Sequence, residues 1–147
     1  MKQLFLAATF VFAVVLTTAA RPAGNENPRV EKAFNQIFTG ATHVNWTEVE
    51  NGLLKASFVW ADRQTVAIFD QQARLIGTIR GLFFREVPLS VTRSVSQHFS
   101  NPVVLEVNEI VNEEGVRYSL IVEDRQAKYD ISIDSLGYIL DKSKRKK

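Results

Sequence analysis

The segment that decides the fold is residues 61–78, ADRQTVAIFDQQARLIGT, which returns in altered form at residues 123–139 as EDRQAKYDISIDSLGYI. The triplet Asp-Arg-Gln stands near the start of both copies, and Asp70 reappears 64 residues later as Asp134. In each copy, apolar residues flank a polar turn that contains an Asp, which predicts a strand, a turn and a second strand. Matches in the same order, with one small insertion, indicate a duplicated unit; the alternative is a chance likeness between similar β-turns.

A helix is predicted ahead of each copy. Pro28 suits the first helical position, Asn27 before it can cap the helix, and Gly40 ends it. Pro88 precedes the second helix, which ends before Pro102. Apolar residues recur at three- and four-residue spacing in both segments, as on one face of a helix. These residues are Val30, Ala33, Phe34, Ile37 and Phe38 in the first helix, and Val91, Val95 and Phe99 in the second.

Four strand-like segments follow each predicted helix. In the first unit, Val44 and Trp46 alternate with polar residues, and Asn51-Gly52 is a strong hairpin signal. Trp60 alternates in phase with Leu54, Ala56 and Phe58, so we expect both tryptophans on the helix-covered face. The strand-like segments in this unit are 44–46, 54–60, 65–69 and 75–79, and those in the second unit are 103–111, 116–123, 129–133 and 138–140.

These elements predict an α+β fold. Each unit has one apolar helix face and one apolar sheet face, which fit each other. Successive hairpins give antiparallel pairing, so the two units join edge to edge into one antiparallel sheet with two helices packed on one face. We expect repeat one at residues 28–82 and repeat two at residues 88–141, together forming one domain.

The order of helix, four strands, helix and four strands resembles the PepSY-like, beta-lactamase-inhibitor-like (BLIP-like) domains of bacterial envelope proteins. The helix VEKAFNQIF at residues 30–38 and the two copies quoted above carry this resemblance, which covers nearly all of residues 28–141. It implies an α+β fold, no catalysis, and a sheet surface that contacts proteins or has no assigned role. The chain lacks the cysteines of the actinobacterial inhibitor protein and a matching contact motif, so no inhibitory residue is carried over.

Residues 1–20 are predicted to be a signal peptide. Lys2 precedes a thirteen-residue run at residues 4–16 that is apolar except for Thr9, and small residues follow it. Cleavage is expected near Ala20, with cleavage after Ala19 as the close alternative. Thirteen helical residues rise about 20 Å, which is short of a bilayer core of about 30 Å. An uncleaved anchor is the alternative. We therefore expect an exported protein, periplasmic or extracellular, with a leader at residues 21–27 and no transmembrane segment in the mature chain.

The net charge of +2 for the 147 residues is the sum of an acidic part and a basic part of the chain. Residues 21–141 hold 12 basic and 16 acidic side chains, whereas five of the last six residues are Lys or Arg. This balance gives no argument for nucleic-acid binding. The sequence predicts a basic tail at residues 142–147, either a solubilising end or a weak contact with anionic lipids.

No catalytic or cofactor motif is present, and we expect neither an enzyme nor a cofactor. The chain has no cysteine, and His43 and His98 have no partner at metal-ligand spacing. Four aspartates lie at predicted strand-end turns, where an Asp side chain accepts hydrogen bonds from backbone N–H groups. They are Asp62, Asp70, Asp124 and Asp134.

The candidate site is the sheet face opposite the helices, and its expected partner is an envelope protein or peptide. Its residues in the two units are Val49, Lys55, Ser57, Val59, Arg117, Ser119 and Ile121. Such a mixed face of β-branched and basic residues is equally compatible with an ordinary solvated sheet. A second functional hypothesis is an envelope sensor that binds a small molecule or cation at the acidic turns or in a cleft between the repeats.

Overall fold

A computed structural model describes residues 27–145, and it begins with a helix where the sequence predicts one. In helix α1 (Pro28–Ile37), Pro28 occupies the first turn, and the Asn27 side-chain oxygen accepts hydrogen bonds from the backbone N–H groups of Arg29 and Val30. On the apolar face, Val30, Phe34 and Phe38 are buried and Ala33 is half-buried, whereas Ile37 is 45% exposed at the end of the helix. The sequence expectation for Ile37 was therefore wrong.

Four strands and one short 3-10 turn follow α1 and form the first half of the sheet. The Asn51-Gly52 hairpin forms as predicted, with φ angles of 62° and 70° that suit a tight turn between twisted strands. The elements are β1 (Thr42–Val49), η1 (Glu50–Gly52), β2 (Leu53–Trp60), β3 (Arg63–Phe69) and β4 (Leu75–Gly81).

Strand β1 departs from the expected alternation at its start. Its register against β2 is irregular between Thr42 and Asn45, and His43 has a positive φ of 54°. Val44, expected to face the helix together with Trp46, is consequently 39% exposed, whereas Trp46 is 9% exposed. The prediction holds for both tryptophans, because Trp60 packs on Phe38 with ring centroids 5.4 Å apart.

The second half of the chain repeats the order of a helix followed by four strands. Val91, Val95 and Phe99 are buried as predicted. The elements are η2 (Phe84–Glu86), α2 (Leu89–His98), β5 (Val103–Asn112), β6 (Gly115–Glu123), β7 (Lys128–Asp134) and β8 (Ile139–Lys144).

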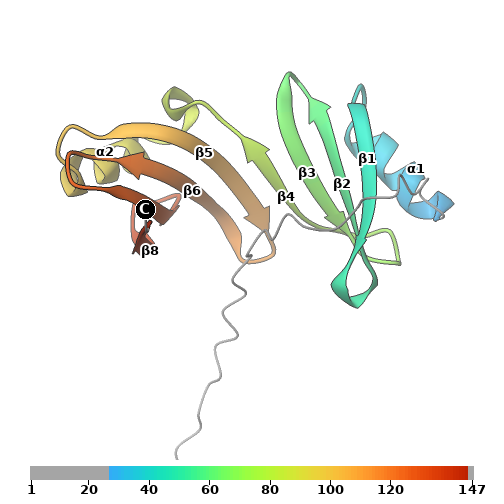
Figure 1. Cartoon of the computed structure of the whole chain (residues 1–147). Helices are drawn as coiled ribbons and strands as arrows, with labels where there is room; N and C mark the ends of the chain where they lie inside the picture. Colours follow the sequence, from blue (N-terminus) through green and yellow to red (C-terminus); the bar gives the residue numbers. More distant parts are fainter. Residues whose placement is uncertain (1–26, 146–147) are drawn as a thin grey trace, which may run out of the picture.

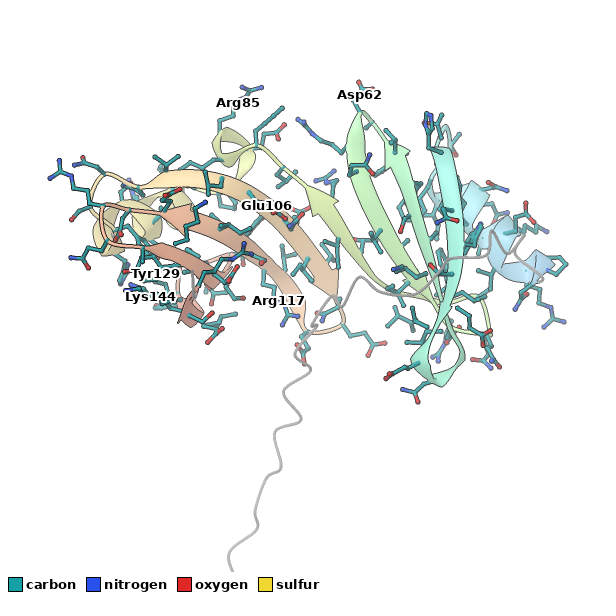
Figure 2. All side chains as sticks on the ribbon, viewed as in Figure 1. Asp62, Arg85, Glu106, Arg117, Tyr129 and Lys144 are labelled. Atoms are coloured by element: carbon teal, nitrogen blue, oxygen red, sulfur yellow. The ribbon has the colours of Figure 1, made fainter. Side chains whose placement is uncertain are left out.

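The expected basic tail at residues 142–147 is largely part of the sheet. Lys142 and Lys144 lie in β8, and Figure 2 shows Lys144 beside its partner Tyr129. The backbone N–H of Arg145 donates to the Lys128 carbonyl at 2.8 Å, and its side chain forms an ion pair with Asp130 at 2.8 Å. The boundary at 141 was therefore wrong, because hydrogen bonds hold residues 142–145; residues 146–147 lie outside the described part.

All eight strands form one open antiparallel sheet in which strand order equals chain order. One row of side chains crosses it from β2 to β7, in the order Phe58, Thr65, Arg80, Glu109, Tyr118 and Ile133. Phe58 is buried in the core below α1, and Ile133 is buried in the core below α2. Both helices therefore pack on the same face, at opposite ends of the sheet (Figure 1). The predicted α+β fold with one antiparallel sheet is confirmed.

Each helix covers its own hydrophobic core. The α1 core includes Phe34, which makes ring contacts with Phe58 at 4.8 Å and Trp46 at 5.2 Å. The α2 core is built around fully buried Val91 and Leu120. No β4 residue belongs to either core, so the two halves meet through strand pairing between β4 and β5 rather than through a shared core.

Two turns, at Asp70 and Asp134, have the same hydrogen bonds. In both, the Oδ1 atom accepts from the backbone N–H groups two and four residues further on, at 3.0 and 2.8 Å in the first turn and at 2.9 Å twice in the second. The third residue after each Asp, Ala73 or Gly137, has a positive φ. Asp124 accepts similar bonds, whereas within the described residues the Asp62 carboxylate accepts none, against expectation.

The α1 core can be tested with Phe34→Ala. Because Phe34 is 2% exposed, we expect the free energy of unfolding in urea to fall by about 3–5 kcal/mol. The control is Leu136→Ala at a position that is 74% exposed, where a change within about 0.5 kcal/mol is expected. Equal losses for the two variants would contradict the assigned core.

The turn at Asp70 predicts a pH-dependent contribution to stability. Burial acts to raise the pKa of Asp70, but hydrogen bonds from Arg74 and Gln72 and the Arg74 charge outweigh it, so the pKa lies below its usual 3.8. The carboxylate therefore stabilises the fold above pH 3.8, and this contribution disappears as the pH falls through the lower folded pKa.

Asp70→Asn should accordingly destabilise the protein at neutral pH, and its difference from the wild type should shrink in acid. Urea unfolding followed by circular dichroism across the acidic range measures this difference. The matched control is Asp62→Asn, in a turn where the carboxylate accepts no hydrogen bond within the described residues. A wild-type advantage over Asp70→Asn that stays constant into acid would argue against the assigned role.

Candidate functional site

The seven residues predicted from the sequence all lie on the sheet face opposite the helices, which we call the open face. Lys55 and Ser57 alternate with buried Ala56, and Ser119 lies between buried Tyr118 and Leu120. The strand register carries the same alternation through the whole sheet. The seven predicted residues on this face are Val49, Lys55, Ser57, Val59, Arg117, Ser119 and Ile121, and each of them is half-buried.

These seven residues form two separate groups on the open face. Ser57 lies across from Val66, which is followed along the same row by Ile79, Ile110 and Arg117. Four strand spacings therefore separate the group on β1 and β2 from the group on β6, a distance of about 19 Å. The basic side chains Lys55 and Arg117 flank the middle of the sheet instead of adjoining each other.

The centre of the open face carries apolar residues that the sequence reasoning did not assign to the site. We call Val66, Ile68, Ile79 and Ile110 the open-face apolar strip. Ile68 is 8% exposed although it belongs to neither core. The available signal was the run of apolar residues at 66–69, because a strand that is apolar on both sides has both faces removed from water.

Glycine keeps the strand surface flat next to this strip. Gly77 pairs with Ile68 on one side and Asn112 on the other. A Cβ atom at Gly77 would lie 2.8 Å from the Val111 carbonyl oxygen, which is too close for any other residue without a backbone shift. The strip therefore borders a section of β4 with no protruding side chain.

Charge divides the open face into two halves. Lys55 is the one charged side chain among the paired open-face positions of β1–β4. On β5–β8 the same face carries acidic and basic side chains together, including Glu106 and Arg117, which are labelled in Figure 2. The apolar strip thus lies between a nearly neutral half and a charged half.

The helix-covered face has a small cavity between the two cores, which we call the seam cavity. It has a volume of about 170 Å³ and is lined by Phe38, Trp60, Thr65, Thr78, Arg80 and Glu109. The Arg80 Nη2 atom lies 2.9 Å from the Glu109 Oε1 atom, and the Tyr118 hydroxyl donates to Oε2 at 3.4 Å. Burial, the Glu109 charge and this hydrogen bond raise the pKa of Tyr118. Five of its six lining residues belong to repeat one (28–82), and one, Glu109, belongs to repeat two.

A larger hollow lies at the far end of the sheet, beside the β6–β7 turn. Residues 123–128 line it together with Lys144 and Arg145, and its volume is about 1040 Å³. Its cations are partly paired, because Lys128 lies 3.6 Å from Glu123 and Arg145 binds Asp130. This pairing reduces the charge that the hollow presents to an anion.

The acidic turns do not offer a set of metal ligands. Within residues 27–145, no three His, Cys, Asp or Glu side chains gather closely enough to hold a metal ion. Asp70, Asp124 and Asp134 use their Oδ1 atoms to accept backbone N–H groups. His98 is hydrogen-bonded through Nδ1 to the Ser94 carbonyl at 2.8 Å.

Membrane insertion and export concern different parts of the chain. No helix within the described range 27–145 combines the length and hydropathy needed to cross a bilayer. The predicted signal peptide at residues 1–20 and all but the last residue of the predicted leader lie outside that range.

Proteins of known structure share the fold of this chain. No protein-family model and no curated protein matches the chain. A Bacteroides eggerthii protein provisionally described as periplasmic has a TM-score of 0.70 at 22% identity, over 80% of this chain and 87% of that one. A DUF2874 family protein from Bacteroides uniformis has a TM-score of 0.69 at 22% identity, over 80% and 88%.

The third neighbour is a BLIP-like protein from Bacteroides fragilis, with a TM-score of 0.67 at 20% identity over 86% of this chain and 88% of that one. None of the three descriptions names an enzymatic activity. The chain therefore has the fold of the BLIP-like and DUF2874 proteins, and the predicted BLIP-like resemblance is confirmed.

Proposed function

We propose that this chain is a non-enzymatic exported domain that binds a protein or peptide through its open face. The observation that carries the proposal is the open-face apolar strip. It lies in the middle of an eight-stranded sheet whose other face is packed against two helices. Ile68 is 8% exposed, and the other three members, Val66, Ile79 and Ile110, are half-buried. An apolar centre with a more polar rim is typical of protein-contact sites.

The surroundings of the strip define the chemistry of the partner. Lys55 and Arg117 stand on either side of the strip, Lys55 in the nearly neutral half of the face and Arg117 at the edge of the charged half. A partner that buries an apolar patch on the strip would gain from acidic side chains placed at its own edges. The mixed charges beyond Arg117 would set the orientation of the partner more than its affinity.

Three further observations support the assignment. A structural neighbour is provisionally described as periplasmic, which agrees with the predicted signal peptide. The descriptions of the neighbours name no catalytic activity, in line with the expected absence of an enzyme. The matching turns at Asp70 and Asp134 support a tandem duplication, which places one helix and one set of four strands at each end of the sheet.

Charge reversal on the open face tests the proposal. The immobilised double variant Lys55→Glu with Arg117→Glu should capture its partner from an envelope extract at least about tenfold less well than the wild type, as measured by quantitative mass spectrometry. The reason is that both basic side chains bordering the strip would then repel an acidic rim.

A matched control reverses two positive charges on the helix-covered side of the protein. Lys32→Glu with Arg93→Glu alters two exposed residues of α1 and α2 and should leave capture unchanged. Thermal unfolding of both double variants establishes that each is folded. If the two folded double variants capture the same protein equally well, the open face is not the binding surface.

A further inference from the structure

Three apolar side chains protrude where the β7–β8 turn meets the start of α2, and we call them the α2 tip. The Ser90 hydroxyl donates to the Ser135 carbonyl at 2.7 Å, and a Cβ atom at Gly137 would lie 2.7 Å from the Ser90 carbonyl oxygen. The turn is therefore held against the helix. The tip consists of the three most exposed large apolar side chains among residues 27–145, at 74, 68 and 63%, which are Leu136, Tyr138 and Leu89.

The fold does not require apolar side chains on this turn, because the equivalent turn in the first half is polar. Leu136 and Tyr138 are the second and fourth residues after the turn aspartate, and Gln72 and Arg74 hold those places in the first half. The backbone N–H groups of all four residues donate to an aspartate Oδ1 atom in the same way. Neither Leu136 nor Tyr138 belongs to the α2 core. Their apolar character therefore serves something other than the turn.

The helix-covered side next to the α2 tip is basic. Residues 87–105, which contain α2, include no Asp or Glu. Arg93 is exposed one helical turn beyond Leu89, on the same face of the helix. Lys142 and Lys144 of β8 lie on this side of the sheet as well, because their β7 partners face the α2 core. Figure 1 shows α2 and β8 at the same end of the sheet.

The acidic side chains of this region lie elsewhere or have partners. Asp134 and Asp141 occupy open-face positions in the register of β7 and β8. Glu86, which precedes α2, is ion-paired with Arg63 at 2.7 Å. Asp124 accepts backbone N–H groups in the β6–β7 turn, at the other end of these strands. A surface that approaches the α2 tip thus meets apolar side chains first, with an excess of positive charge around them.

An anionic bilayer matches this combination better than a protein does. Three side chains cover far less than the area of about 800 Å² that a stable protein interface buries on each partner. The boundary of a bilayer takes up individual apolar side chains and favours Tyr. When its lipids are anionic, each nearby Lys or Arg strengthens binding about fivefold. Contributions of this size give a reversible attachment.

We propose that the α2 tip inserts into the headgroup region of an anionic bilayer, with Arg93 and the two β8 lysines over the lipid phosphates. The membrane contact is on the helix-covered side, so the open face is left free for a partner while the protein is attached. The proposal does not rest on protein binding by the open face. Either one can fail without affecting the other.

A fluorophore beside the tip tests insertion directly, and the absence of cysteine from the chain allows it to be attached at one chosen position. Ser135→Cys, labelled with nitrobenzoxadiazole, keeps all three tip residues. Its fluorescence should rise and shift to shorter wavelength with vesicles of phosphatidylcholine and phosphatidylglycerol at about 3:1. The same label on Gln71→Cys, the equivalent position of the polar turn, should not respond. Residues 21–147 are used, because the apolar segment at residues 1–20 would itself bind vesicles.

A graft of the polar turn assigns the binding to the apolar side chains. Leu136→Gln with Tyr138→Arg copies the residues of the first turn, so the fold should persist, and the added charge would by itself favour an anionic surface. Vesicle co-sedimentation should nevertheless fall at least about tenfold, because two apolar side chains are lost. Ile37→Gln, which removes an exposed apolar side chain of α1, should leave binding unchanged. Binding of the wild type should weaken at high salt and on phosphatidylcholine alone.

The proposal is overturned if the label at position 135 does not respond up to about 5 mM lipid, or if the labels at positions 71 and 135 respond alike. It is also overturned if the folded graft binds vesicles as the wild type does, or if vesicles of phosphatidylcholine alone are bound equally well. A wild-type dimer in sedimentation analysis that becomes a monomer in the graft would assign the tip to a protein contact and would likewise overturn it.

Discussion

The pairing between β4 and β5 is the constraint on which the rest of the structure depends. Residues 77–81 of β4 pair with residues 108–112 of β5 and join two halves that have separate hydrophobic cores. The same register sends Ile79 and Ile110 to the open face and Arg80 and Glu109 to the helix side. A slip of β5 by one residue would exchange its two faces, placing Glu109 on the open face and leaving Arg80 without its partner.

The sizes of the elements explain why the middle of the sheet differs from its ends. Eight strands make a sheet about 34 Å wide, whereas two helices with their side chains cover about 20 Å of it. Apolar side chains fill the covered ends. Arg80, Glu109 and two threonines occupy the seam, where a hydrogen-bonded ion pair can keep some contact with water. Because each half of the sheet has one helix, a polar cavity is left between two apolar cores.

Local sequence patterns were enough to predict both helices, the Asn51-Gly52 hairpin and the face on which each tryptophan lies. These predictions rest on the spacing of residues that are close in the sequence, and the structure confirms them. Sequence patterns failed where strand pairing decides the outcome. Val44 lies in an irregular part of the β1–β2 register, which breaks the expected alternation. Residues 142–145 were predicted to be a tail from their charge, but they belong to the end of the sheet. The apolar strip and the seam cavity were missed because they arise from β4 pairing with β5, across the linker and α2. No local spacing reports that contact.

Photo-crosslinking in the native envelope tests the central claim most directly. A photoreactive residue would be placed at Ile79, in the middle of the open-face apolar strip, and in a parallel protein at Leu136, which is 74% exposed on the β7–β8 turn. The proposed function predicts a discrete adduct with one envelope protein from position 79 and none of that mass from position 136. Random encounters would favour the more exposed Leu136. The same adducts from both positions, or from 136 alone, would contradict a partner bound on the open face.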